Sequence, residues 1–212
     1  MPRVRALAKG VGRPKVGAAP LDAELKIREA ALELFAARNF SSVTTKDIAR
    51  ATGLNTALIY YYFGSKEELF RRTVALAVER AFHQFRIVRQ NLSRPRDIIY
   101  GWLDNHVREY DTITKLVRIA IDYAGTEGRK STIDKAIRRF YDEEREVLRE
   151  ALSAGIACGD FRKVDVDATA TFISTYLDGV IVRAVILKDF DPVSAIAELR
   201  SFMNSALLGA EK

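Results

Sequence analysis

Residues 44–66 read TTKDIARATGLNTALIYYYFGSK and decide the fold of this chain. They contain two short helix patterns joined by a turn with a glycine. Thr44 stands three residues before Asp47, and a threonine followed at that spacing by an acidic residue is typical of a capped helix start. The first helix is therefore predicted over residues 45–51. Gly53 then occupies the position past the helix end where a left-handed backbone is needed.

A second short helix is predicted over residues 56–63, with Asn55 as its N-cap. Gly64 ends it, and Ser65 followed three residues later by Glu68 predicts the capped start of a longer helix. Helical spacing turns one set of side chains toward a core, namely Leu58, Ile59 and Tyr62 or Phe63. It leaves another set on or near the outer face, namely Thr56, Ala57, Tyr60 and Tyr61.

Such a pair of helices is typical of a helix-turn-helix, whose second helix enters the major groove of DNA and reaches base edges with its N-terminal residues. Free backbone N–H groups at helix starts also suit phosphate oxygens. The candidate DNA-binding residues of the motif are Thr45, Asn55, Thr56, Ala57, Tyr60, Tyr61 and Lys66. Helix–glycine turn–helix segments also occur in many all-α proteins, so the turn by itself leaves both interpretations open.

The distribution of charge favours DNA. Residues 1–66 hold 11 Lys and Arg against 5 Asp and Glu, whereas the remaining residues hold 23 of each sign. The whole formal net charge of +6 therefore lies in the first third of the chain. Basic residues gathered beside a helix-turn-helix form an electrostatic footprint for a polyanion.

Residues 1–20 form a predicted disordered basic arm, because they are rich in glycine and proline and cannot bury a core. Within this arm, Arg13 and Lys15 flank Pro14 and are candidates for insertion into a minor groove. A merely solvated tail explains the same composition equally well.

The chain resembles the TetR family of bacterial transcriptional regulators over about residues 27–70. The matching positions are Ile27, Ala30, Ala31, Leu34, Phe35, Phe40, Thr44, Asp47, Ile48, Ala49, Gly53, Leu54, Asn55, Ile59, Tyr60, Phe63, Lys66, Leu69 and Phe70. The departures are Asn55 in place of the more usual serine, Ala57 where glycine is frequent, and Tyr61 and Tyr62 where histidine is frequent. These departures leave the predicted fold intact and leave base specificity open.

The rest of the chain also reads as helix, so the predicted fold is all-α. Further helices are expected over residues 65–91, 95–109, 111–124, 131–158, 165–187 and 192–208. No useful strand alternation is present. The predicted organisation is a three-helix helix-turn-helix DNA-binding domain over residues 21–66, followed by a larger helical effector-binding and dimerisation domain over residues 67–212.

The last two predicted helices carry apolar stripes at helical spacing. The resemblance implies that two such helices from each subunit form a four-helix dimer interface. The candidate dimer residues are Ile173, Leu177, Val180, Ile181, Ala184, Leu199 and Met203. An ordinary core within one chain explains the same stripes. A dimer is expected on separate grounds, because two recognition helices related by a two-fold axis read a palindrome.

A pocket for a small effector of unknown identity is implied by the resemblance. Rings with polar tips suit such a pocket, and the candidates are Trp102, His106, Tyr110, Tyr123, Phe172 and Tyr176. Each of these residues is equally at home in a core. We expect the effector to prefer one arrangement of the domains and thereby to lower DNA affinity.

Other classes of function find little support. The chain has no metal-binding, nucleotide-binding or nucleophile motif, so no catalytic residue, metal or cofactor is predicted. Asp142, Glu143 and Glu144 share their helix with several arginines, which favours a solvated salt-bridged face. The sequence contains no run of 18 apolar residues, so no membrane span is predicted, and no signal-peptide pattern is recognised. The single cysteine, Cys158, suits a reducing cytoplasm and is expected to be buried.

The sequence therefore predicts a cytoplasmic, sequence-specific transcriptional regulator that binds a palindromic DNA operator as a homodimer and responds to a ligand. Repression is favoured over activation because the family mostly works by occupying promoters. The alternative is a sequence-neutral DNA-binding protein that uses the basic arm and phosphate contacts.

Overall fold

The computed structural model describes residues 20–208, so Arg13 and Lys15 of the predicted arm lie outside it. Within that range the chain forms nine α-helices and no strand, which confirms the all-α prediction. The helices are α1 (Pro20–Ala37), α2 (Thr45–Thr52), α3 (Thr56–Phe63), α4 (Lys66–Arg89), α5 (Pro95–Arg108), α6 (Tyr110–Ala124), α7 (Ser131–Cys158), α8 (Val166–Ile186) and α9 (Pro192–Leu207). The predicted helix ends agree with these bounds to within two residues.

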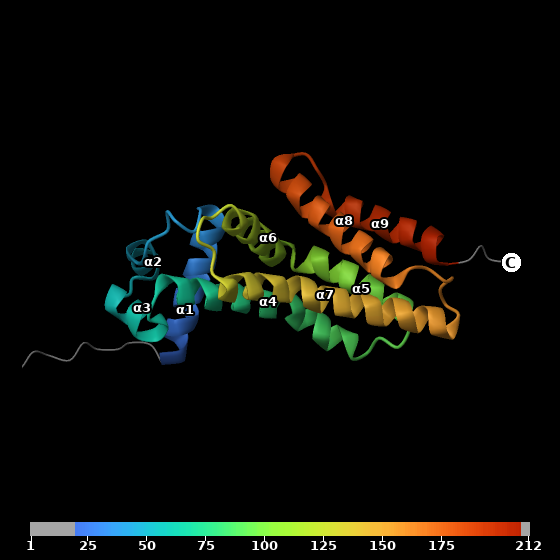
Figure 1. Cartoon of the computed structure of the whole chain (residues 1–212), viewed down its shortest axis with the longest axis horizontal. Coiled ribbons are helices and arrows are strands. Elements are labelled where there is room, and N and C mark those ends of the chain that lie inside the picture. Colours follow the sequence, from blue (N-terminus) through green and yellow to red (C-terminus); the bar gives the residue numbers. More distant parts are fainter. Residues whose placement is uncertain (1–19, 209–212) are drawn as a thin grey trace, which may run out of the picture.

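The first three helices enclose a small core at one end of the molecule (Figure 1). Buried apolar side chains from all three helices meet there, because each helix has an apolar face turned toward the other two. These side chains are Ile27, Ala31, Phe35, Ile48, Ile59 and Phe63.

Helix α4 joins this small core to the rest of the protein. It is 24 residues long and runs from the helix-turn-helix into the second half of the molecule (Figure 1). Near its start, the Phe70 ring lies edge-on to Phe35 of α1, with ring centroids 4.8 Å apart. Further along, Phe82 and Phe85 are buried in the larger core. Both halves of the chain are therefore built on the same helix.

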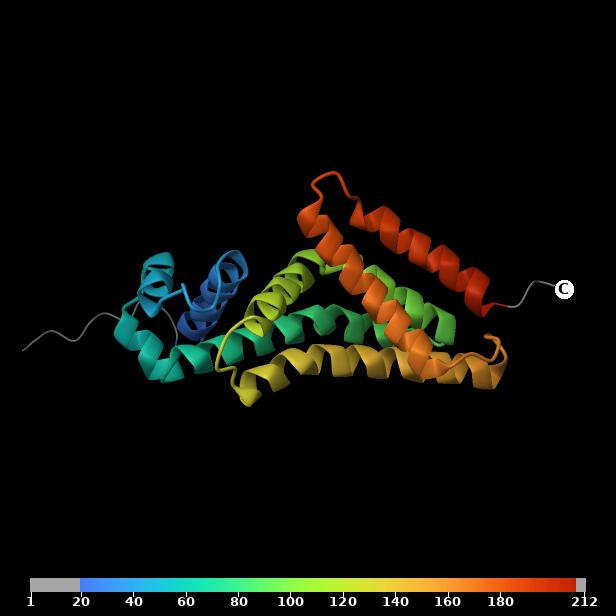
Figure 2. The same ribbon diagram turned by 45° about the horizontal axis from the view of Figure 1, so that its top comes forward.

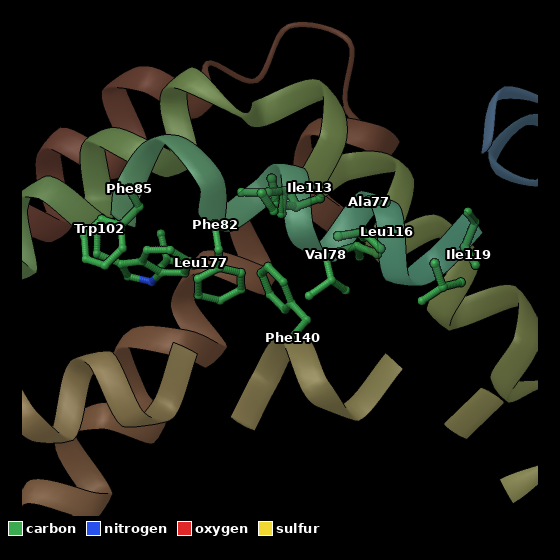
Figure 3. Packing of buried hydrophobic residues seen from close by; sticks show 14 of the residues in the cluster. Ala77, Val78, Phe82, Phe85, Trp102, Ile113, Leu116, Ile119, Phe140 and Leu177 are labelled. Carbon is green, nitrogen blue, oxygen red and sulfur yellow. The ribbon is translucent and has the colours of Figure 1, made fainter. Parts of the chain in front are cut away.

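Trp102 of α5 is fully buried in the larger core, where rings from neighbouring helices surround it (Figure 3). The Phe82 ring stacks on Trp102 with centroids 4.8 Å apart, and Phe85 meets it edge-on at 5.0 Å. Phe140 of α7 packs against Phe82 from the other side, at 5.5 Å. Three helices thus meet through large rings, which bury more apolar area than any other side chains.

Helices α8 and α9 form a hairpin on the outer side of the larger half (Figures 1 and 2). By length and composition α8 is apolar enough to cross a membrane, with a mean hydropathy of 1.3 over its best window. Its packing gives another reason for this composition, because α8 lies against α7, α6 and α9. Only 28% of that window is buried within the chain, so packing explains one face of α8 and leaves its other face exposed.

The predicted dimer stripe needs correction. Six of its seven residues are buried against the same chain, and Ala184 is half-buried. The six are Ile173, Leu177, Val180, Ile181, Leu199 and Met203. A side chain already enclosed within one chain has no surface left for a partner, so these residues form the internal core of α8 and α9.

A second correction concerns Cys158, which is exposed at the end of α7 rather than buried. Gly159 follows it in the left-handed conformation with φ 83° and ends the helix. The chain then folds back, so that Phe161 covers Gly155 of α7 and its N–H donates to the Gly155 carbonyl oxygen at 3.0 Å.

This return of the chain makes a test of the packing. A Cβ atom on Gly155 would lie 2.1 Å from the Phe161 ring. We expect Gly155→Ala to lower the free energy of unfolding by about 1–3 kcal/mol, as overpacking of a filled site does. Chemical denaturation measures the change. The control is the same substitution in a Phe161→Ala background, where the added methyl has room. An equal loss in both backgrounds would contradict the steric explanation.

Candidate DNA-binding site

The predicted caps of α2 are present. Thr44 accepts a hydrogen bond from the Asp47 N–H through its hydroxyl at 3.2 Å, and its own N–H donates to the Asp47 carboxylate at 3.0 Å. The hydroxyl and N–H of Thr44 lower the pKa of Asp47 by bonding to its ionised form. Gly53 ends the helix with φ 68°. Local bonds therefore fix both ends of α2, and Gly53 forms the turn into α3.

Helix α3 presents its N-terminal residues outward, as the spacing predicts. The Asn55 side chain accepts from the Ala57 N–H at 2.8 Å, while Ile59 and Phe63 anchor the opposite face. Of the predicted inward residues, Leu58 and Tyr62 are only half-buried. On the other side Tyr60 is 52% exposed and Tyr61 is 80% exposed. The exposed rings of α3 are therefore free to contact a molecule that binds to the motif.

Two of the predicted DNA-binding residues meet across the motif. The Thr45 hydroxyl of α2 and the Tyr60 hydroxyl of α3 lie 3.4 Å apart. Thr45 is half-buried at the first position of α2, and Thr56 is half-buried at the first position of α3. The two helix starts thus carry hydroxyl groups that can bond phosphate or base edges.

Lys66 has a partner inside the chain that the sequence did not reveal. Its ammonium group lies 4.4 Å from the centre of the Phe40 ring and donates to the Ser41 carbonyl oxygen at 3.4 Å. Partial burial lowers its pKa. Lys66 therefore holds the loop between α1 and α2 in place, in addition to any contact with phosphate.

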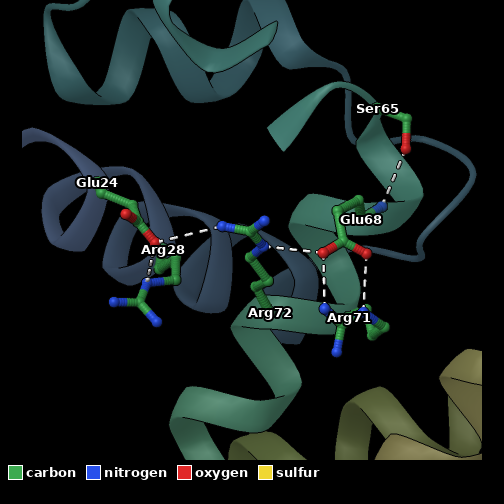
Figure 4. A network of polar contacts seen from close by, with 6 residues as sticks. All are labelled: Glu24, Arg28, Ser65, Glu68, Arg71 and Arg72. Carbon is green, nitrogen blue, oxygen red and sulfur yellow. Dashed lines mark hydrogen bonds and ion pairs between the residues drawn. The ribbon is translucent and has the colours of Figure 1, made fainter. Parts of the chain in front are cut away.

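The start of α4 carries a network of ion pairs that links it to α1 (Figure 4). The Glu68 carboxylate accepts two bonds from Arg71, at 2.6 and 2.7 Å, and one from Arg72 at 2.8 Å. Arg72 also lies 3.7 Å from Glu24 of α1. The bonds from Arg71 lower the pKa of Glu68 to about 2, so the network stays ionised at neutral pH.

A contact between the two halves of the chain was also missed. The Phe40 N–H, in the loop after α1, donates to the Asp122 carboxylate of α6 at 2.8 Å. Beside it, the Tyr123 ring lies 5.8 Å from the Phe40 ring and 5.3 Å from the Phe70 ring. The sequence separation of 82 residues leaves no local signal that could have predicted this bond.

The six predicted pocket residues do not lie around one cavity. Trp102, His106 and Tyr123 are buried in the core, Tyr110 and Tyr176 are half-buried, and Phe172 is exposed on α8. Of the six, Tyr123 lines an open cleft of about 310 Å³ between α6 and α7. A smaller cavity of about 200 Å³ lies between α7 and α8, and both share Tyr141 and Arg145 in their walls.

The smaller cavity lies beside a buried polar cluster. Its lining residue Ser174 bonds the Glu144 carboxyl group, which also accepts from the Trp102 indole N–H at 3.0 Å. His106 Nε2 lies 3.5 Å from the same group. The prediction of a solvated face for Glu144 is therefore wrong, since its side chain is buried.

Burial controls ionisation in this cluster. It raises the pKa of Glu144 and lowers the pKa of His106 to about 4, so the imidazole is neutral at pH 7. Asp178 lines the cavity, and burial together with the nearby Glu144 raises its pKa to about 6. Within residues 20–208, neither carboxyl group forms an ion pair with lysine or arginine.

The geometry defines a class of protein: a helix-turn-helix DNA-binding protein with a second helical domain. Models of known families assign both halves to a single family. Residues 27–73 match the model of bacterial regulatory proteins of the tetR family, and residues 111–208 match the C-terminal domain of BetI-type transcriptional repressors. The chain belongs to the TetR family of transcriptional regulators.

Individual relatives agree with this assignment. The repressor AcnR of Corynebacterium glutamicum is 29% identical over 86% of this chain and 93% of its own length. The uncharacterised regulator YfiR of Bacillus subtilis is 26% identical over 89% of this chain and 93% of its own. A putative regulator from Saccharomonospora viridis, solved in complex with choline, is 20% identical and superposes with a TM-score of 0.78 over 90% of this chain and all of its own.

The predictions of family and of function class are thereby confirmed. The chain is a DNA-binding transcriptional repressor of the TetR type and not an enzyme. The roles of the individual DNA-binding residues, the dimer and the effector site remain predictions.

Proposed function

We propose that the protein represses transcription in the cytoplasm as a homodimer that occupies a palindromic operator and leaves it when a small effector binds. The observation that carries this proposal is the exposed face of α3. A capped helix start, a threonine and two open tyrosines lie together there. This face has the size and chemistry that suit the major groove.

We assign sequence reading to α3 and phosphate contacts to the residues around it. The residues proposed to contact base edges are Thr56, Ala57 and Tyr61. The residues proposed to contact the DNA backbone are Asn55, Thr45, Tyr60 and Lys66. The basic arm with Arg13 and Lys15 adds charge at the same end of the sequence. Both roles follow from chemistry, because phosphate contacts position a protein and base contacts specify its site.

Selection from a random DNA pool at near-physiological salt tests this assignment. We expect an enriched palindrome, and we expect Thr56→Val, which keeps shape but loses the hydroxyl, to weaken the operator by about 1–3 kcal/mol relative to random DNA. Lys66→Gln should weaken both DNAs alike and reduce the salt slope by about 0.9. Equal loss on both DNAs from Thr56→Val would favour the sequence-neutral alternative.

The surface that we propose for the dimer lies on α8 and α9, on the side opposite the buried stripe. Phe172 and Phe202 are 44% and 54% exposed there, with ring centroids 5.4 Å apart. Exposed aliphatic side chains occur on the same hairpin, namely Val185, Ile186, Leu187 and Val193. Aromatic residues are enriched in interfaces, and open apolar patches mark contact sites.

The charge-introducing substitution Phe202→Glu should separate the dimer, because it would bury an unpaired carboxylate in the interface. We expect the dimer dissociation constant to rise at least tenfold, measured by analytical ultracentrifugation. The control is Ile87→Glu, which places the same charge on an exposed isoleucine of α4. A dimer unaffected by Phe202→Glu, or equally weakened by both variants, would move the interface elsewhere.

For the effector we propose the cavity between α7 and α8 and an organic cation as ligand. Tyr141 supplies a ring, and Asp178 supplies a carboxyl group that has no basic partner in the described chain. Rings and carboxylates together recognise alkylammonium groups. The Saccharomonospora viridis protein was solved with choline, which makes choline the first probe to use.

We expect choline to bind the free protein and to weaken its operator complex, measured by calorimetry and by fluorescence anisotropy. Asp178→Asn should weaken choline binding at least tenfold and leave operator affinity unchanged. The control is Asp142→Asn, which removes a carboxylate from the neighbouring α6–α7 cleft. A larger effect of Asp142→Asn would place the site in that cleft, and no binding at millimolar choline would refute choline as the effector.

A further inference from the structure

The hydrogen bond between the Phe40 N–H and the Asp122 carboxylate joins the two halves of the chain. Among residues 20–208, it is the only hydrogen bond that joins a side chain of the second half to the backbone of the helix-turn-helix half. Asp122 lies in the last turn of α6, and Phe40 lies in the loop that leads into α2. Since a backbone N–H cannot swing away independently of the chain, this bond fixes the position of the loop itself.

Aromatic packing surrounds the bond. Phe40 lies edge-on to Phe70 with centroids 4.7 Å apart, and Tyr123 packs against both rings. Tyr123 is 2% exposed, and its hydroxyl accepts from the Lys130 N–H at 2.8 Å, in the segment before α7. We call Phe40, Asp122 and Tyr123 together the Phe40 contact.

On one side, the Phe40 contact reaches the DNA-binding helices. Four residues after Phe40 comes Thr44, the N-cap of α2. The Phe40 ring also forms a cation–π contact with the ammonium group of Lys66, the first residue of α4, which follows α3 closely in the chain. A shift of Phe40 relative to α6 would therefore displace the start of α2 and the end of α3 together.

On its other side, the Phe40 contact borders the larger cleft. Tyr123 lines the α6–α7 cleft, and Tyr141 lines both that cleft and the smaller cavity between α7 and α8. An occupant of the α6–α7 cleft would touch Tyr123, whose ring packs against Phe40. The contact thus lies where the interior of the second half meets the DNA-binding half.

We propose that Asp122 is a positioning residue that fixes the helix-turn-helix relative to the second half, through its bond to the Phe40 N–H and with Tyr123 as support. This inference rests on the proposed function only for its effect on the operator. The positioning itself concerns one chain and can be measured without DNA.

The variants are Asp122→Ala, which removes the acceptor, and Asp122→Asn, whose amide oxygen still accepts from an N–H. The matched control is Glu33→Ala, which removes an exposed bond between α1 and Lys115 of α6. All variants carry Cys158→Ser and spin labels at Lys46→Cys on α2 and Glu146→Cys on α7, two exposed positions. Labelled chains are diluted with unlabelled protein, so that distances within one chain are measured by double electron–electron resonance.

We expect one narrow distance distribution for the parent, Asp122→Asn and Glu33→Ala, and a broadened or shifted one for Asp122→Ala. Operator affinity should fall at least fivefold in Asp122→Ala alone. An unchanged distribution in Asp122→Ala, or equal damage from Asp122→Asn, would overturn the proposal. A changed distribution with unchanged operator affinity would support the positioning and overturn its effect on the operator.

The two proposals fail differently. If no operator is found but the distribution changes in Asp122→Ala and is restored in Asp122→Asn, the positioning role stands and the proposed function is wrong. If an operator is found and Asp122→Ala binds it normally with the parent distribution, the reverse holds.

Discussion

The burial of α4 in two cores is the constraint on which the rest of the structure depends. Phe70 belongs to the small core and Phe82 and Phe85 to the larger one, so neither half can pack without the same helix. A helix of 24 residues is about 36 Å long and resists bending over that length. The contacts beside α4 therefore determine how far the two halves can move relative to one another. They include the Phe40 contact on α6 and three ion pairs of α1, which join Glu24 to Arg72, Glu29 to Arg80 and Glu33 to Lys115.

Local signals predicted the fold of the DNA-binding half because its turns are fixed by short-range bonds. Caps act within four residues of their own position, as Thr44, Gly53, Asn55 and Ser65 do. Helix ends could thus be read from residue types and spacing. The exposed face of α3 followed from the same spacing once Ile59 and Phe63 were turned inward.

Tertiary partners could not be predicted in this way. Apolar periodicity identified the buried face of α8 but could not decide whether a partner subunit or the same chain buries Ile173 and Leu177, and the structure shows that the same chain does. The same limitation hid the second role of Lys66, whose ring partner lies 26 positions earlier in the sequence, and the bond between Phe40 and Asp122. Interactions across such separations depend on how helices cross, which periodicity along one helix does not encode.

The burial of Glu144 is better explained by a binding role than by a contribution to stability. A carboxyl group enclosed without lysine or arginine loses hydration, and a well-packed apolar side chain at the same place is often as stable or more so. Trp102 and Ser174 satisfy its oxygens, yet its pKa and that of Asp178 remain raised. Perturbed carboxyl groups beside a cavity are more typical of a binding site than of a scaffold. Neither carboxyl group is ion-paired with lysine or arginine in the described chain, although Arg145 lines the same cavity, so a cation that enters would be a partner for Asp178. Tyr141 lines both this cavity and the α6–α7 cleft, which Tyr123 also lines. The polar cluster and the Phe40 contact therefore border neighbouring cavities that share Tyr141 in their walls.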